Sequence, residues 1–172
     1  MKVVLFAGYS ESGKTTALAA ITRALAKKGK RVGTIKHSGH AVLDLDAKGK
    51  DTWMHFNSGA SVVVGMTSEQ MAIFKRLDRP EAQVDEVLQM MEREGIEYVL
   101  VEGLYEEFSG RKGVPIVICA KAKEDAAELL KRHGRALFVT GRIAAGPNLE
   151  PINGIPVLDL QKGTDRALEL IG

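Results

Sequence analysis

The chain has 172 residues, of which 45% are hydrophobic and 27% are charged, a balance that excludes disordered and fibrous proteins. Its 24 basic and 22 acidic residues leave a net charge of +2, too small to favour nucleic acid or an anionic membrane as a partner. The single cysteine, Cys119, excludes an internal disulfide. We therefore expect one cytoplasmic domain over residues 1–172 that binds neither nucleic acid nor membrane.

Short hydrophobic runs alternate with amphipathic segments along the chain. The run K-V-V-L-F-A at residues 2–7 predicts a strand buried on both faces, and residues 15–28 carry a helical stripe. Further strands are predicted at residues 31–35, 61–66, 98–101, 115–119, 136–139 and around Val157. Further helices are predicted at residues 51–57, from Pro80 to near Gly95, and at residues 122–132 and 164–171. Alternating strands and helices predict an α/β fold with a mostly parallel sheet. Residues 71–77 are predicted to pair with residues 61–66 as a hairpin.

A glycine-rich sequence, G-Y-S-E-S-G-K-T, joins the first strand to the first helix. It matches the P-loop pattern G-x-x-x-x-G-K-[ST], in which backbone N–H groups at the helix start surround the phosphates of a nucleotide. Lys14 would then reach the β- and γ-phosphates, and the Thr15 hydroxyl would bind Mg²⁺. The nucleotide-binding residues that this motif predicts are Gly8, Tyr9, Ser10, Glu11, Ser12, Gly13, Lys14, Thr15 and Thr16.

Glu102 directly follows the buried run Y-V-L-V, at the strand end where open α/β sheets bind ligands. A carboxylate at this point would hold Mg²⁺ directly or through a water, although a merely solvated glutamate has the same pattern. Gly103 permits a close approach and favours the functional interpretation. We therefore predict Lys14 and Glu102 as catalytic residues, and Thr15 and Glu102 as metal ligands.

The polar segment 36–50 lacks a helical or strand period and predicts a functional loop. Lys36 and His37 would contact phosphate, and Asp46 (or Asp44) would support the metal. His37, His40 and His55 lack the compact spacing of metal ligands. A zinc site and solvated histidines are the two alternatives to a role in ligand contact.

These motifs together resemble those of the MobB family, the molybdopterin-guanine dinucleotide biosynthesis adaptor proteins. The resemblance is carried by G-Y-S-E-S-G-K-T-T, the Lys36-His37 pair, the K-D-T segment that leads to His55, and L-V-E-G at residues 100–103. It implies a three-layer α/β/α P-loop NTPase fold and a homodimer. It also implies binding of GTP, Mg²⁺ and molybdopterin or its guanine dinucleotide, with Lys36 and His37 as candidate contacts to the pterin. At most slow GTP hydrolysis is implied, beside a MobA-type nucleotidyltransferase that attaches GMP to molybdopterin.

The chain departs from the family pattern at two points. Met54 precedes His55 where an arginine is expected, and Val139-Thr140-Gly141 lacks a nearby aspartate to pair with guanine. Guanine specificity is therefore implied by the resemblance alone. Two other functions stay open: an ATP-dependent kinase or ligase of the dethiobiotin synthetase type, with residues 74–79 as the lid, and a metallochaperone GTPase that uses the histidines.

Overall fold

A computed structural model describes residues 1–38, 48–77, 83–146 and 149–172 of the chain. The chain divides into two units, one formed by Met1–His37 with Val84–Gly172 and the other by Ser38–Gln83. The single domain over residues 1–172 stays a prediction.

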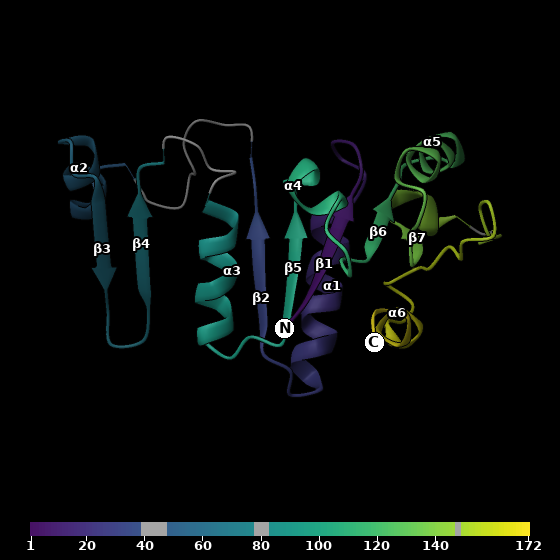
Figure 1. Ribbon diagram of the computed structural model, residues 1–172, viewed down its shortest axis with the longest axis horizontal. Coiled ribbons are helices and arrows are strands. Elements are labelled where there is room, and N and C mark those ends of the chain that lie inside the picture. The colour runs from purple at the N-terminus through teal and green to yellow at the C-terminus, as the bar shows by residue number, and fades with distance from the viewer. Residues whose placement is uncertain (39–47, 78–82, 147–148) are drawn as a thin grey trace. The chain divides into compact units, whose positions relative to one another are not determined.

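The first unit is built on a five-stranded sheet with the order β2-β5-β1-β6-β7, which can be followed in Figure 1. All its paired strands are parallel. The strands are β1 (Lys2–Ala7), β2 (Val32–Lys36), β5 (Tyr98–Glu102), β6 (Ile116–Cys119) and β7 (Phe138–Thr140). The register pairs Glu102 with Phe6 on one side and with Lys36 on the other. The carboxyl ends of three strands therefore meet at one edge of the sheet.

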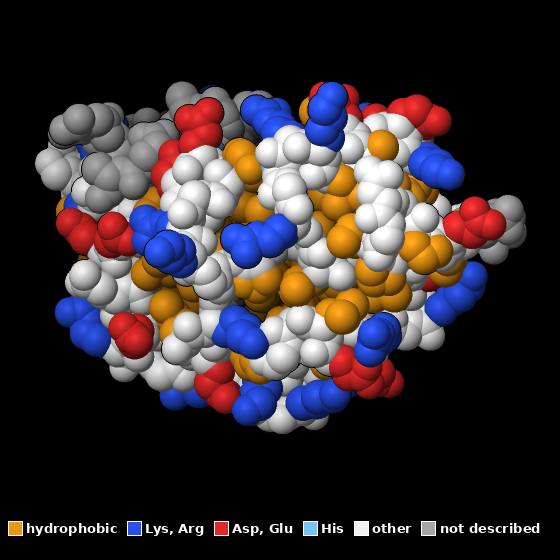
Figure 2. All heavy atoms as spheres, turned by 45° about the vertical axis from the view of Figure 1, so that its right-hand side comes forward, with side chains coloured by type: hydrophobic (Ala, Val, Ile, Leu, Met, Phe, Trp, Pro, Cys, Tyr) orange, Lys and Arg blue, Asp and Glu red, His pale blue; other side chains and the backbone are white. Residues whose placement is uncertain are grey.

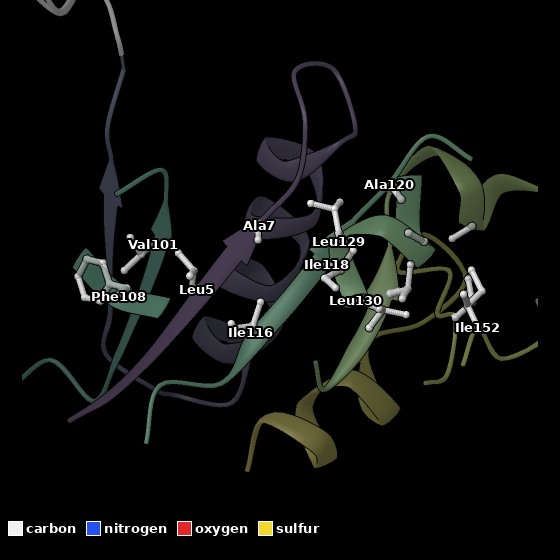
Figure 3. Packing of buried hydrophobic residues seen from close by; sticks show 14 of the residues in the cluster. Leu5, Ala7, Val101, Phe108, Ile116, Ile118, Ala120, Leu129, Leu130 and Ile152 are labelled. Atoms are coloured by element: carbon white, nitrogen blue, oxygen red, sulfur yellow. The ribbon is translucent and has the colours of Figure 1, made fainter. Parts of the chain in front are cut away.

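Helices cover both faces of this sheet, as expected for strands without polar alternation. One hydrophobic cluster joins β-strand residues to α1 (Lys14–Lys27) and α6 (Asp165–Ile171). The other joins them to α3 (Val84–Arg93), α4 (Tyr105–Ser109) and α5 (Lys123–His133). Figure 3 shows part of this second cluster, in which Leu5 of β1 lies between Val101 of β5 and Ile116 of β6. The three-layer α/β/α architecture is thus confirmed.

The second unit contains the predicted hairpin. β3 (Val62–Met66) pairs antiparallel with β4 (Met71–Lys75), and α2 (Asp51–Asn57) contacts this hairpin through an edge-on pair of the Phe56 and Phe74 rings, 6.4 Å between centroids. Alternate side chains point to the opposite face, and five hydrophobic ones are exposed there: Val62, Val64, Met66, Met71 and Ile73.

Most elements agree with the sequence predictions to within about two residues at each end. Two short helices were not predicted: α4 and the 3₁₀ helix η2 (Arg142–Ala145). The strand expected around Val157 is reduced to an isolated bridge between Val157 and Val139. None of the described helices has the length and apolar character needed to cross a membrane. On the face shown in Figure 2, basic and acidic side chains both surround a hydrophobic middle, in keeping with the nearly balanced charge.

Candidate functional site

The loop between β1 and α1 is held close to the neighbouring strand ends. A Cβ atom at Gly8 would lie 2.2 Å from the carbonyl oxygen of Cys119, so a larger residue does not fit there. Gly13 has a φ of 95° at the N-cap of α1, and no side chain caps this helix start. Since the first N–H groups of a helix have no partner within it, those of α1 are available to an anion.

A second loop, which follows β7, packs against the first. A Cβ atom at Gly141 would lie 2.2 Å from the Ser12 carbonyl oxygen, and the backbone N–H of Arg142 donates to that same oxygen at 3.1 Å. The Ser12 hydroxyl is buried and has no hydrogen-bond partner among the described residues. The segment at residues 141–142 therefore holds the P-loop in place through close packing and one backbone hydrogen bond.

Lys14 folds back over the loop that precedes it. Its Nζ donates to the carbonyl oxygens of Gly8 (2.9 Å) and Tyr9 (2.6 Å). Partial burial lowers the pKa of Lys14, and the attraction of Glu102 opposes this only in part. The ammonium group therefore lies at the mouth of the loop, where phosphate oxygens would compete for it.

Glu102 is the centre of a small polar network at the sheet edge. Its carboxylate accepts from the Thr15 hydroxyl at 3.0 Å, and the Lys36 Nζ lies 2.5 Å from its Oε1 atom. Only 7% of the Glu102 side chain is exposed, whereas 55% of the Lys36 side chain is. The structure thus brings together Thr15, Lys36 and Glu102, which lie far apart in the sequence.

His37 and Gly103 extend this contact along the two strand ends. The His37 N–H donates to the Glu102 carbonyl oxygen at 2.9 Å, and a Cβ at Gly103 would lie 2.9 Å from the His37 Cβ. Because Gly103 also has a φ of 89°, glycine is the residue that suits both the conformation and the contact.

The donor set at this edge suits Mg²⁺, which prefers hard oxygen ligands. The Thr15 hydroxyl and the Glu102 carboxylate already lie within hydrogen-bond distance of each other, so one ion could contact both oxygens after a small adjustment. Asp46, the third predicted ligand, lies outside the described residues, as do Asp44 and His40. Within the described ranges, no three His, Cys, Asp or Glu side chains are grouped to hold a metal.

A cleft of about 960 Å³ begins at these residues, within the size range of ligand pockets. Its lining residues from the P-loop and α1 include Glu11, Gly13, Lys14, Thr15 and Thr16. Glu102 lines it from the sheet edge. The remaining wall, which the motifs did not predict, comes from Arg23 of α1 and from residues 140–142, 144–145 and 159–161.

Other predicted residues lie at the rim or outside this cleft. The Tyr9 hydroxyl donates to Glu128 of α5 at 2.7 Å, and this bond raises the pKa of Tyr9. Ser10 is an exposed residue of the loop. His55 belongs to α2 in the other unit. Cys119 is fully buried in β6, and burial raises the pKa of its thiol to about 12.

Comparison with known proteins identifies relatives of this chain. The family model "Molybdopterin guanine dinucleotide synthesis protein B" (MobB) matches residues 3–138. The molybdopterin-guanine dinucleotide biosynthesis adapter protein of Haemophilus influenzae is 38% identical over 100 residues, 58% of this chain and 55% of that protein. A putative adapter protein of the same description from Methanocaldococcus jannaschii is 32% identical over 133 residues, 77% of this chain and 53% of that protein.

A solved structure supports the fold over nearly the whole chain. The crystal structure of a MobB protein homolog from Bacillus stearothermophilus superposes with a TM-score of 0.65 at 25% identity, covering 99% of this chain and 96% of that one. In contrast, the matched region spans little more than half the length of these two curated relatives.

Proposed function

Because the chain belongs to the MobB family, we propose that it is a GTP-binding adaptor in the biosynthesis of the molybdenum cofactor. In this role it would bind Mg²⁺-GTP and assist a MobA-type nucleotidyltransferase, which attaches GMP to molybdopterin. Hydrolysis of GTP would be slow at most. The names of the relatives, each an adapter protein of molybdopterin-guanine dinucleotide biosynthesis, support this proposal.

The observation that carries the nucleotide-binding part is the contact between Thr15 and Glu102. A P-loop hydroxyl and a strand-end carboxylate lie 3.0 Å apart beside an uncapped helix start. Phosphate oxygens and Mg²⁺ need these two kinds of group at adjacent positions. The match to the motif and this geometry are independent, since the motif itself says nothing about residue 102.

Different residues of the site would bind the phosphates and Mg²⁺. The N–H groups at the start of α1 and the Lys14 ammonium would bind the phosphates, while Thr15 and Glu102 would hold Mg²⁺. The ion would neutralise charge on the phosphate oxygens. Lys36, paired with Glu102 here, would turn toward the γ-phosphate once Mg²⁺ neutralises that carboxylate.

Rapid hydrolysis would need an arginine beside the phosphates; Arg23 and Arg142 line the cleft, but among the described residues neither is hydrogen-bonded to Lys14, Thr15 or Glu102. An arginine that neutralises charge in the transition state contributes about 10³ to 10⁵ in rate. Arg111, in the loop after α4, pairs with Asp85 at 2.6 Å and donates to the Glu107 carbonyl oxygen at 2.8 Å. A binding role with slow turnover therefore agrees better with the site than a metabolic kinase or ligase.

Two further parts of the proposal concern assembly. The exposed face of the β3–β4 hairpin would pair with a second copy of the chain, giving a homodimer. Val63 of β3 does not belong to this face, because it is buried within the chain. Pterin binding by Lys36 or His37, and a cytoplasmic location, stay predictions.

Reconstitution with purified components tests the adaptor role. A MobA-type nucleotidyltransferase, molybdopterin and Mg²⁺-GTP are incubated with and without the chain, and the guanine dinucleotide formed is measured. We expect more product, or product at lower GTP concentration, when the chain is present. Lys14→Ala, which removes the phosphate-facing ammonium, should abolish the gain. The same yield with and without the chain would contradict the adaptor role.

A further inference from the structure

A groove beside α5 has no part in nucleotide or metal binding as described above. Its volume is about 630 Å³, and α5 and the turn at residues 152–155 form its walls. The residues that matter below are Ala127, Glu128, Leu130, Lys131 and Ile155. We infer that this α5 groove binds an acidic segment of a protein partner that also carries an apolar side chain, and that Glu128 connects its occupancy to the P-loop. The inference rests on the proposed adaptor function, for which it supplies the docking surface.

The floor of the α5 groove is apolar and well ordered by its neighbours. Ala127, Leu130 and Lys131 are three and four residues apart, so they lie along one stripe of the helix. Opposite them, the ends of the turn at residues 152–155 exchange two backbone hydrogen bonds of 2.9 Å, and both central residues have the positive φ of a tight hairpin turn. Leu130, labelled in Figure 3, and Ile155 belong to one hydrophobic cluster. An apolar side chain in the groove would therefore contact apolar atoms on two sides.

The rim of the groove is basic where α5 ends. Lys131, Arg132 and Arg135 place three positive charges within five residues, and all three residues are exposed. No ion pair joins any of them to a carboxylate in the part of the chain that the structure describes. Glu128 is the single carboxylate among the lining residues, and it already accepts a hydrogen bond from Tyr9. Carboxylates on a partner would thus meet complementary charge at this rim.

The apolar floor and the basic rim together favour a protein segment over other anions. Nucleic acid would meet the rim through its phosphates but has no aliphatic side chain for the floor. A membrane-binding surface inserts exposed hydrophobic side chains, and none of the large hydrophobic residues of α5 or of the turn at residues 152–155 is exposed. A segment with leucine or phenylalanine among acidic residues suits both parts of the groove.

The helix that forms the groove also contacts the nucleotide site. Glu128 accepts from the Tyr9 hydroxyl at 2.7 Å, and the carbonyl oxygen of Tyr9 accepts from the Lys14 Nζ at 2.6 Å. Farther along α5, the His133 ring lies 4.3 Å from the ring of Tyr105 in α4, the helix that follows β5. A partner in the groove would therefore touch a residue that holds the P-loop. Phosphates that draw Lys14 away from Tyr9 would act on the same contacts from the other side, so each ligand would change the affinity of the other by the same factor.

The docking surface is tested by biolayer interferometry with the nucleotidyltransferase of the proposed function as the immobilised partner. Wild-type binding should weaken as the salt concentration rises. Lys131→Glu should bind about tenfold or more weakly, because it places like charges opposite each other. Lys131→Arg, which keeps the charge, should bind as the wild type does. Lys123→Glu is the matched control, because it makes the same charge change at the other end of α5 and outside the groove lining. All three variants should bind GTP alone with wild-type affinity.

The connection to the P-loop is tested by titrating GTP with and without saturating nucleotidyltransferase. We expect the partner to change the GTP affinity of the wild type by about 5- to 150-fold. Tyr9→Phe removes only the hydroxyl that donates to Glu128, so this ratio should fall to near one while the partner still binds. The same ratio in Tyr9→Phe and in the wild type would overturn the role of Glu128.

Three further results would overturn the docking surface. Equal partner affinity in Lys131→Glu and Lys123→Glu would do so and would leave the adaptor function intact, since the complex still forms. Light scattering that gives a lower mass for Lys131→Glu than for the wild type would instead assign the groove to a second copy of the chain. A wild-type chain that binds phosphatidylglycerol vesicles through Lys131 but not the nucleotidyltransferase would assign it to a lipid surface. In that last case, as with no complex at all, the proposed adaptor function would fail as well.

Discussion

The Lys36 ammonium lies 2.5 Å from the Glu102 carboxylate, and the two residues are register partners at the ends of β2 and β5. The carboxylate is nearly fully buried, while the lysine is half-exposed. A buried carboxylate without a cation is costly, so Lys36 supplies in this state the positive charge that Mg²⁺ would supply in the nucleotide complex.

Replacement of Lys36 with Met should therefore destabilise the chain. Loss of one hydrogen-bonded charged partner at a buried group costs about 1–3 kcal/mol, and we expect the thermal midpoint to fall by several degrees. Added Mg²⁺ should restore part of this loss, because a divalent cation can take the place of the ammonium. Differential scanning fluorimetry measures both effects. Lys36→Arg, which keeps the charge, is the control; an unchanged midpoint in Lys36→Met would contradict the role of the pair.

Nucleotide affinity should depend on pH through Lys14. Burial lowers the pKa of Lys14 in the free chain, and a bound phosphate would raise it by favouring the charged form. Affinity is then constant at neutral pH and falls as the pH rises through the pKa of the free chain, so the loss begins below the ordinary lysine value of 10.5. Titration calorimetry at several alkaline pH values measures this fall. In Lys14→Ala the affinity should be low and should not depend on pH in this way. A wild-type affinity that stays constant up to pH 10.5 would contradict the role assigned to Lys14.

GTP turnover should be slow in the isolated chain and slower still in Glu102→Gln. Because no arginine of the described residues is hydrogen-bonded to Lys14, Thr15 or Glu102, we expect a rate well below about one per second. The glutamine keeps the shape of the side chain but loses the charge that holds Mg²⁺, so residual turnover should fall. Phosphate release under multiple-turnover conditions gives both rates. Rapid ATP consumption that requires a small carboxylate or alcohol would instead establish the kinase or ligase hypothesis.

The hairpin face should mediate dimerisation. Val64 and Ile73 are cross-strand partners and both are exposed, so a charge at either position would be buried in a dimer at a high cost. Light scattering should give twice 18.6 kDa for the wild type and 18.6 kDa for Val64→Asp. Glu69→Lys changes a charge on the same hairpin but outside the hydrophobic face, and should stay dimeric. A wild-type mass near 18.6 kDa at micromolar concentration would contradict the proposed dimer.

The sequence predicts the P-loop side of the cleft better than the wall formed by residues 159–161, for a physical reason. The P-loop is contiguous, and Glu102 ends a hydrophobic run, so local patterns are sufficient to locate both. Asp159 follows a segment that joins the sheet through a single bridge, without the long hydrophobic run that marks a strand. Its place beside β7 depends on hydrogen bonds between distant segments, which no local pattern encodes.

The missed helix α4 illustrates the same limit. It has five residues, and its N-cap, Leu104, adopts a left-handed conformation with φ of 53°. Phe108 is its one buried residue, too little for a helical stripe to be recognised. The pairing of Lys36 with Glu102 likewise depends on the sheet order β2-β5-β1, which follows from packing of the whole unit.

The central claim is that the loop at residues 8–16 binds a nucleoside triphosphate with Mg²⁺. Isothermal titration of GTP, with Mg²⁺ present, into the wild-type chain and into Lys14→Ala tests it most directly. We predict one GTP per chain for the wild type. Because charge-assisted contacts of this kind contribute about 1.5–3 kcal/mol, affinity should be about tenfold or more weaker in a Lys14→Ala chain with an unchanged thermal midpoint. Equal GTP affinity in the two folded proteins, or no binding to the wild type, would contradict the account.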